Sequence, residues 1–180
     1  MNLRKIRKKG KSKIENITQL YLLNMDISVL TGIENFSALN YLDVRFNNLT
    51  ELDLSQNTKL ESLFTSGNAQ LTSLFLGANT SLSRFQAEGC ALTSLDLSQN
   101  TGLTHLDLNG SSISNINVSQ NTGLTYLNLN GSTISNINLS YNTELTELRL
   151  NSYQGTSIDL SQNTGLTDLS LNGSSISNIN

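Results

Sequence analysis

Proline and tryptophan are absent from this 180-residue sequence, cysteine occurs once, and only 14% of the residues are charged. The single cysteine, Cys90, excludes an internal disulfide and does not identify the redox compartment. We interpret Cys90 as a small buried residue, the usual role of an unpaired cysteine. Stability must therefore come from the apolar and neutral polar side chains.

Long apolar runs are also missing. No stretch approaches the length of a transmembrane helix, and the basic start of the chain is not followed by the apolar segment of a signal peptide. We therefore expect no signal peptide in this chain and no membrane insertion. The localisation stays open.

Positive charge is scarce after the first thirteen residues. Residues 1–13 hold seven of the eleven Lys and Arg residues, and from residue 14 onward four basic residues face fourteen acidic ones, a net charge of −10. Such a region repels phosphates, so we expect it to bind no nucleic acid. We interpret residues 1–16 as a basic tail or the remnant of a preceding cap, and residues 17–180 as the folded domain.

Neutral polar residues are abundant, because Asn, Ser and Thr together supply 68 residues. They belong to a repeat of 21 residues: LTHLDLNGSSISNINVSQNTG from Leu103 is followed directly by LTYLNLNGSTISNINLSYNTE from Leu124. The units begin at Ile17, Leu39, Leu60, Leu82, Leu103, Leu124, Leu145 and Leu166, and those at Ile17 and Leu60 carry one extra residue. The chain therefore holds about seven and a half units.

Apolar residues fall at positions 1, 4, 6, 11, 14 and 16 of the unit, so each unit has two similar halves. In each half the last two lie two residues apart, the period of a strand whose alternate side chains point inward. One turn cannot bury such a face alone, so successive turns must stack about 4.8 Å apart. The sequence predicts a mostly β solenoid with two short parallel strands per turn.

Asparagine recurs near the end of the complete units from Leu39 onward, at Asn57, Asn79, Asn100, Asn121, Asn142 and Asn163. A bend leaves backbone groups without strand partners, and a stacked Asn amide can donate to and accept from the adjacent turn. We therefore predict an asparagine ladder. The other corner begins with Asn47 and Asn68 and continues with Cys90, so we expect it to be looser or to pack differently.

Residues 39–49, LNYLDVRFNNL, match the pattern LxxLxLxxNxL and lead into TELDLSQNT. This pattern resembles the leucine-rich-repeat family, in particular its bacterial 21-residue subclass with internalin-like surface proteins, and the resemblance covers residues 17–180. It implies a right-handed solenoid of low curvature that acts as a non-enzymatic binding module, often secreted or on the cell surface. The first unit is similar to the internalin form, which has a 3₁₀ segment on its convex side.

Positions 3 and 5 flank the inward residue of the first strand, so their side chains face solvent. These two columns change from turn to turn, whereas the equivalent columns of the second half are mostly Ser, Asn and Asp. Tyr and Arg often anchor interfaces. We predict a site for a protein partner made of Tyr21, Tyr41, Phe64, Arg84, His105, Tyr126 and Arg149. The alternative is that these are isolated surface residues without a role.

Catalytic and metal-binding patterns are missing. His105 is the only histidine, and the sequence places no Ser, Cys or Lys to form a catalytic pair with it. The Asp residues lack the spacing of calcium-binding repeats, and no zinc or phosphate motif occurs. We expect no enzyme activity, no metal and no cofactor.

A second hypothesis is a surface-adsorbing or structural repeat, in which the regular Ser, Thr and Asn columns of the second half contact a polysaccharide or ice. A protein binder depends on Arg84 and Tyr126, whereas an adsorbing repeat depends on residues such as Asn115 and Asn136. The last unit stops at Asn180 with its apolar residues uncovered. Either the protein continues or this end meets a partner, for example by end-to-end self-association.

Overall fold

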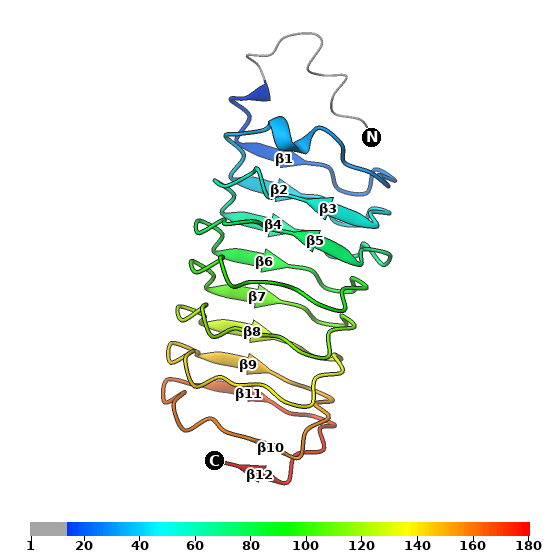
Figure 1. The fold of residues 1–180 in the computed structure, drawn as a ribbon. Helices are drawn as coiled ribbons and strands as arrows, with labels where there is room; N and C mark the ends of the chain where they lie inside the picture. Colours follow the sequence, from blue (N-terminus) through cyan, green and yellow to red (C-terminus); the bar gives the residue numbers. More distant parts are fainter. Residues whose placement is uncertain (1–13) are drawn as a thin grey trace.

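Each unit forms one turn of a solenoid in the computed structural model, which describes residues 14–180 (Figure 1). Positions 3 to 5 of every turn form a strand of one eight-stranded parallel sheet, the main sheet. Its strands are, in order, β1 (Gln19–Tyr21), β2 (Tyr41–Asp43), β4 (Ser62–Phe64), β6 (Arg84–Gln86), β7 (His105–Asp107), β8 (Tyr126–Asn128), β9 (Glu147–Arg149) and β11 (Asp168–Ser170). The predicted β solenoid is confirmed. Residues 1–13 of the predicted basic tail lie outside the described residues.

The register of the main sheet stacks the same position of every unit. Leu63 lies opposite Leu42 on one side and Phe85 on the other, and Phe85 in turn lies opposite Leu106. All four side chains are fully buried, because position 4 points into the solenoid. In the last turn Leu169 and Ile179 are exposed, since they pack only on the turn before them.

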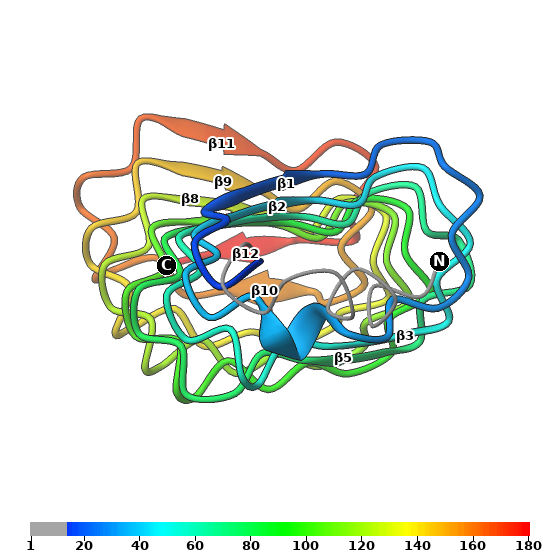
Figure 2. The same cartoon turned by 90° about the horizontal axis from the view of Figure 1, so that it is seen from above.

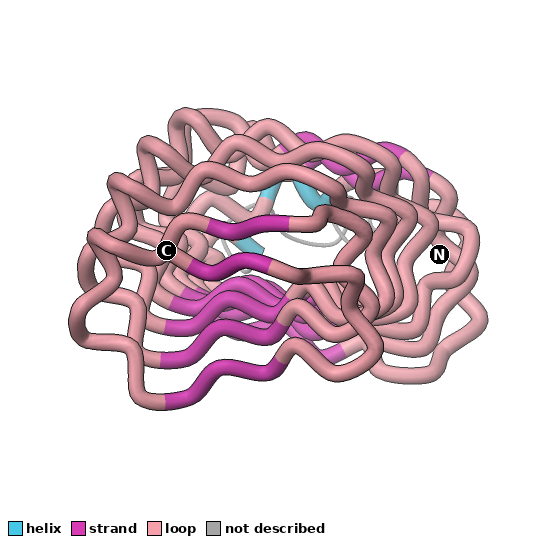
Figure 3. Tube along the Cα trace, turned by 90° about the horizontal axis from the view of Figure 1, so that it is seen from below, coloured by secondary structure: helices cyan, strands magenta, loops and turns pink. Residues whose placement is uncertain are grey.

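Two short sheets lie on the opposite side of the solenoid from the main sheet (Figures 2 and 3). One pairs β3 (Glu51–Asp53) with β5 (Ser73–Phe75), and the other pairs β10 (Ser157–Ile158) with β12 (Asn178–Ile179). The predicted second strand thus forms in four turns. In the turns that begin at Leu82, Leu103 and Leu124 the equivalent segment carries no strand, although its apolar residues Leu97, Ile116 and Ile137 are buried.

The first turn has a short 3₁₀ helix, η1 (Ile33–Asn35), in place of a full second strand. Ile33 and Phe36 point into the core and are buried. This confirms the 3₁₀ segment that the resemblance implied. Ile14, which the sequence analysis assigned to the N-terminal segment, is also buried in the same core.

The asparagine ladder is present and joins consecutive turns. The Nδ2 group of Asn121 donates to the carbonyl oxygens of Asn100, at 2.8 Å, and of Leu97, at 3.1 Å. Asn142 donates in the same way to Asn121, at 2.9 Å, and Asn163 to Asn142, at 2.8 Å. The six predicted asparagines are all buried.

Only the donor half of the predicted ladder bonding forms in most turns. The Oδ1 atoms of Asn57, Asn121, Asn142 and Asn163 are buried without a hydrogen-bond partner. The amide nitrogen reaches back to the preceding turn, which leaves the oxygen turned away from any N–H group. The expectation that each amide also accepts a hydrogen bond from the adjacent turn is therefore wrong for these four residues.

The corner after the main-sheet strands has its own, shorter ladder. Asn47 donates to the carbonyl of Leu22 at 2.7 Å, and Asn68 donates to that of Val44 at 2.9 Å. Cys90 occupies the next place, buried, with its thiol 3.3 Å from the carbonyl oxygen of Thr65. This confirms Cys90 as a small buried residue, and burial raises the pKa of its thiol. Ser111 follows, with an unpartnered hydroxyl, so the ladder ends there.

Truncation of a core residue tests the stacking. Leu106 on β7 packs between Phe85 and Leu127 of the adjacent strands and is fully buried. We expect Leu106→Ala to lower the free energy of unfolding by about 2–5 kcal/mol in urea denaturation, because it leaves a cavity. The exposed Thr122→Ala is the control, expected within about 0.5 kcal/mol of the wild type. A loss below about 1 kcal/mol for Leu106→Ala would contradict this packing.

Removal of one ladder amide tests the polar connection between turns. Asn121→Ala removes two buried hydrogen bonds, so we expect a loss of about 1–3 kcal/mol in the free energy of unfolding. The matched control is Asn136→Ala, which truncates an exposed asparagine one turn further along. Equal melting temperatures for the two variants would show that the ladder contributes nothing measurable.

Candidate binding surface

The predicted partner-binding residues all lie on the outer face of the main sheet, where positions 3 and 5 face away from the core. Tyr21 and Arg84 are exposed, and the remaining five, Tyr41, Phe64, His105, Tyr126 and Arg149, are half-buried. Half-burial arises because neighbouring side chains on this face contact each other. The structure gathers them into two clusters with Arg84 between.

The first cluster is a run of three aromatic rings across three adjacent strands. The ring centroids of Tyr21 and Tyr41 are 5.0 Å apart, and those of Tyr41 and Phe64 are 5.3 Å apart. Both pairs are tilted by about 40°, a favourable arrangement for aromatic rings. The three rings form a continuous apolar strip at the N-terminal end of the sheet.

Arg45 completes this cluster and was missed by the sequence analysis. Its guanidinium lies 5.4 Å from the centroid of the Phe64 ring. It also donates to both carboxylate oxygens of Asp43, at 3.0 Å from Nε and 2.7 Å from Nη2. Burial raises the pKa of Asp43, but these hydrogen bonds outweigh it and hold the pKa below its ordinary value. Arg45 follows the strand and lies outside positions 3 and 5 of its unit. Its spacing of two residues from Asp43 is the sequence feature that could have predicted this ion pair.

The second cluster centres on a stacked pair. The rings of His105 and Tyr126 lie 4.0 Å apart and are nearly parallel, at 6°. Arg149 lies 5.7 Å from the centre of the Tyr126 ring and pairs with Glu147. Asp107 on β7 accepts a hydrogen bond from the Tyr126 hydroxyl at 3.4 Å. This cluster is therefore more polar than the first.

Arg84 stands on β6 between the two clusters, with Ser62 and His105 as its neighbours across the sheet. Within residues 14–180 it makes no ion pair, whereas Arg45 and Arg149 are both paired with carboxylates. Its charge is therefore available to an acidic group from outside.

The electrostatics of the face keep His105 neutral. Burial lowers the pKa of His105, and the nearby charge of Arg84 lowers it further, whereas Asp107 and Glu147 oppose the shift. Burial also raises the pKa of Tyr126, as does the charge of Asp107. At neutral pH both rings are uncharged, which suits stacking rather than proton transfer.

Other kinds of site receive no support in residues 14–180. No group of three or more His, Cys, Asp or Glu residues is placed to hold a metal ion. None of the helices in this part of the chain is long and apolar enough to cross a membrane. In the described part of the chain the outer face instead offers aromatic rings, the unpaired Arg84 and two paired arginines on one continuous sheet.

No protein-family model and no curated protein matches the sequence. Solved structures do match. Internalin C2 from Listeria monocytogenes is 22% identical with a TM-score of 0.75, and the match covers 93% of this chain and 76% of that one. The functional domain of InlJ from the same species, which includes a cysteine ladder, is 21% identical with a TM-score of 0.61, covering 91% of this chain and 55% of that one.

A leucine-rich-repeat protein of Leptospira interrogans is 18% identical with a TM-score of 0.64, and the match covers 92% of this chain and 54% of that one. The chain thus spans little more than half the length of the InlJ functional domain and of the Leptospira protein structure.

The titration of His105 tests the electrostatics of the face. We expect an NMR titration midpoint below 6.5, the ordinary value for histidine, because burial disfavours the charged ring. Arg84→Ala removes a repelling charge and should raise the midpoint. Because the folded-state pKa is the lower one, the stability contributed by His105 is present above about pH 6.5 and is lost as the pH falls through the folded-state pKa. A midpoint above 6.5 would contradict this description.

Proposed function

The chain has the internalin-like leucine-rich-repeat solenoid fold, and from this premise we propose that it is a non-enzymatic module that binds a protein partner. The binding surface is the outer face of the main sheet, centred on Tyr41, Phe64, Arg84, His105 and Tyr126. Tyr21 and Arg149 extend the surface at its two ends. Fold alone does not identify a partner, so the proposal rests on the side chains.

The observation that carries the proposal is the pre-arrangement of aromatic and cationic side chains on this face. The Tyr41 and Phe64 rings contact each other, and the His105 and Tyr126 rings are stacked. Side chains that are already held in place lose little conformational entropy on binding. Tyr and Arg are also the residue types that most often dominate binding energy at interfaces.

Arg84 supports a protein partner with an acidic side chain. It is exposed between the two clusters and makes no ion pair within residues 14–180. A carboxylate on the partner could accept two hydrogen bonds from its guanidinium, while apolar side chains on either side pack on Phe64 and Tyr126. A polysaccharide lacks this combination unless it is acidic.

The second hypothesis, adsorption to polysaccharide or ice through the regular columns, has weaker support. Such adsorption needs evenly spaced side chains on a flat sheet. The segments that carry Asn115 and Asn136 form no strand, so these side chains lack a continuous ladder beneath them. Polysaccharide stays the alternative ligand, and end-to-end self-association stays a prediction.

The biological setting that we propose follows the fold. The chain is one module of a bacterial surface or effector protein, and the resemblance to internalins favours secretion or the cell surface. With fourteen acidic and four basic residues from residue 14 onward, this module is suited to neither nucleic acid nor anionic lipid.

Photo-crosslinking followed by affinity measurement tests the proposal. A photoreactive amino acid at position 62, beside Arg84 on the main sheet, should capture a protein partner, whereas one at position 136, on the other side of the solenoid, should not. With the captured partner in hand, we expect Arg84→Ala and Tyr126→Ala each to weaken the Kd about tenfold or more in surface plasmon resonance. Asn136→Ala is the control. The proposal fails if the Asn136 variant loses affinity and the other two do not.

A further inference from the structure

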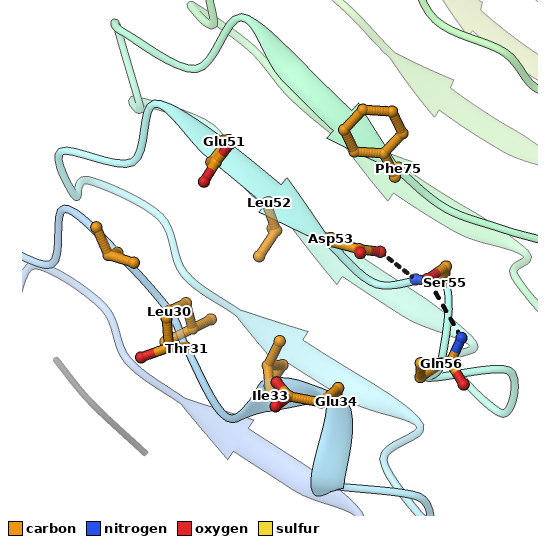
Figure 4. Close-up of a pocket in the computed structure, with 11 residues that line it drawn as sticks. Leu30, Thr31, Ile33, Glu34, Glu51, Leu52, Asp53, Ser55, Gln56 and Phe75 are labelled. Carbon is orange, nitrogen blue, oxygen red and sulfur yellow. Dashed lines mark hydrogen bonds between the residues drawn. The ribbon is translucent and has the colours of Figure 1, made fainter. Parts of the chain in front are cut away.

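A groove of about 480 Å³ lies on the side of the solenoid opposite the main sheet, between the first turn and the sheet formed by β3 and β5 (Figure 4). Buried Leu30, Ile33 and Leu52 contribute to its lining. Val29 and Phe75 line it with exposed apolar surface, 44% and 59% exposed. Covering this exposed apolar surface with a partner would be favourable.

Phe75 has Asp53 as its direct partner across the sheet. The main sheet contains the same arrangement, because Asp43 is the direct partner of Phe64. There, Arg45 covers the pair: its guanidinium lies over the Phe64 ring and bonds to the Asp43 carboxylate. The molecule thus shows how an Asp and a Phe at this spacing hold an arginine.

The backbone after the aspartate is also alike in the two places. The Oδ1 atom of Asp43 accepts a hydrogen bond from the backbone N–H of Arg45 at 3.1 Å. The Oδ1 atom of Asp53 accepts one from the backbone N–H of Ser55 at 2.9 Å. The residue two places after the aspartate is therefore arginine in the first case and serine in the second. Ser55 is too short to reach the ring.

A third acid and ring pair also holds an arginine, although here the ring lies on the turn before the acid. Glu147 and Tyr126 are direct partners across the main sheet, and Arg149, two residues after Glu147, pairs with the carboxylate and lies over the ring. Of these three acid and ring pairs, the pair Asp53 and Phe75 alone has no arginine two residues after its acid.

The surroundings of this open pair are acidic. Glu51 lines the same groove, and no lysine or arginine of residues 14–180 is among its lining residues. A smaller hollow of about 260 Å³ adjoins Phe75 and is lined by Asp96. The local charge therefore favours a cation.

We propose that Asp53 and Phe75 bind an arginine side chain of a protein partner, with an apolar residue beside that arginine lying in the groove. The guanidinium stacks on the Phe75 ring and donates hydrogen bonds to the Asp53 carboxylate, as Arg45 does on the other face. Arginine fits better than lysine, because a planar guanidinium both stacks and forms paired hydrogen bonds. This surface is separate from the main-sheet face, so it does not rest on the function proposed above.

The test uses the full chain, labelled with ¹⁵N, and the capped peptide Gly-Leu-Arg-Val-Gly as the probe. We expect the amide signals of Asp53 and Phe75 to shift on titration, and the affinity to fall about tenfold or more when citrulline, which is uncharged, replaces the arginine. Phe75→Ala and Asp53→Asn should each weaken binding about fivefold. Asp159→Asn, an exposed aspartate with the same local hydrogen bond on another turn, is the matched control and should bind like the wild type.

The decisive variant is Ser55→Arg, which places an arginine where Arg45 stands on the main sheet. It should fill the open pair from within and abolish binding of the peptide, with an unchanged circular dichroism spectrum. Equal binding of the citrulline peptide, or full binding to the Ser55→Arg variant, would overturn the proposal. Binding that appears only after Arg4 and Arg7 are replaced with Gln would assign the pair to the chain's own first residues. If self-association of the chain competes with peptide binding, the pair Asp53 and Phe75 would be assigned to contact with a second copy. Either result would also overturn it.

Discussion

No turn of this solenoid has a hydrophobic core of its own, and every other feature depends on that constraint. A turn contributes a thin layer of leucine and isoleucine side chains, which become buried only when a neighbouring turn lies one strand spacing away. Two kinds of interaction between neighbouring turns satisfy this constraint. Apolar side chains such as Leu63 and Leu106 stack along the axis, and the buried amides of Asn121 and its equivalents satisfy the carbonyl groups at the bend.

The sequence period predicted the main sheet well, because the same side chains had to point inward in each turn. The alternation of side chains around Leu106 predicted a strand where β7 lies, and the recurring asparagines predicted the asparagine ladder. The second strands were predicted less well. Ile116 and Ile137 are buried as expected, but burial shows only that a side chain points inward and not that its backbone forms a strand. Whether adjacent backbones come close enough to form the hydrogen bonds of a sheet depends on the shape of the whole turn. No short sequence pattern encodes that shape.

The candidate site also has features that the sequence predicts and features that it does not. Comparing columns identified the face and its rings, since a column of exposed side chains can be read directly from the repeat. Contacts between columns could not be read in this way. The stacking of His105 on Tyr126 and the position of Arg45 over Phe64 depend on rotamers and on the corner that follows each strand. The pair Asp53 and Phe75 lies in columns that otherwise hold mostly Ser, Asn and Asp, so a comparison of columns does not single it out.

The ladder amides have a direction, since each Nδ2 group donates to the turn before it, whereas the Oδ1 atoms of Asn57, Asn121, Asn142 and Asn163 receive no hydrogen bond. The ladder asparagine thus attaches each turn to its predecessor through the same two groups, an Nδ2 donor and a backbone carbonyl acceptor. A gene encoding such a chain can gain or lose a 21-residue unit by unequal recombination without creating a mismatch at the new junction. The units from Leu103 and Leu124 share 15 of 21 residues, which is the kind of similarity that a duplication would leave. Solenoid length, and with it the reach of the exposed face, is then a property that evolution can adjust one turn at a time.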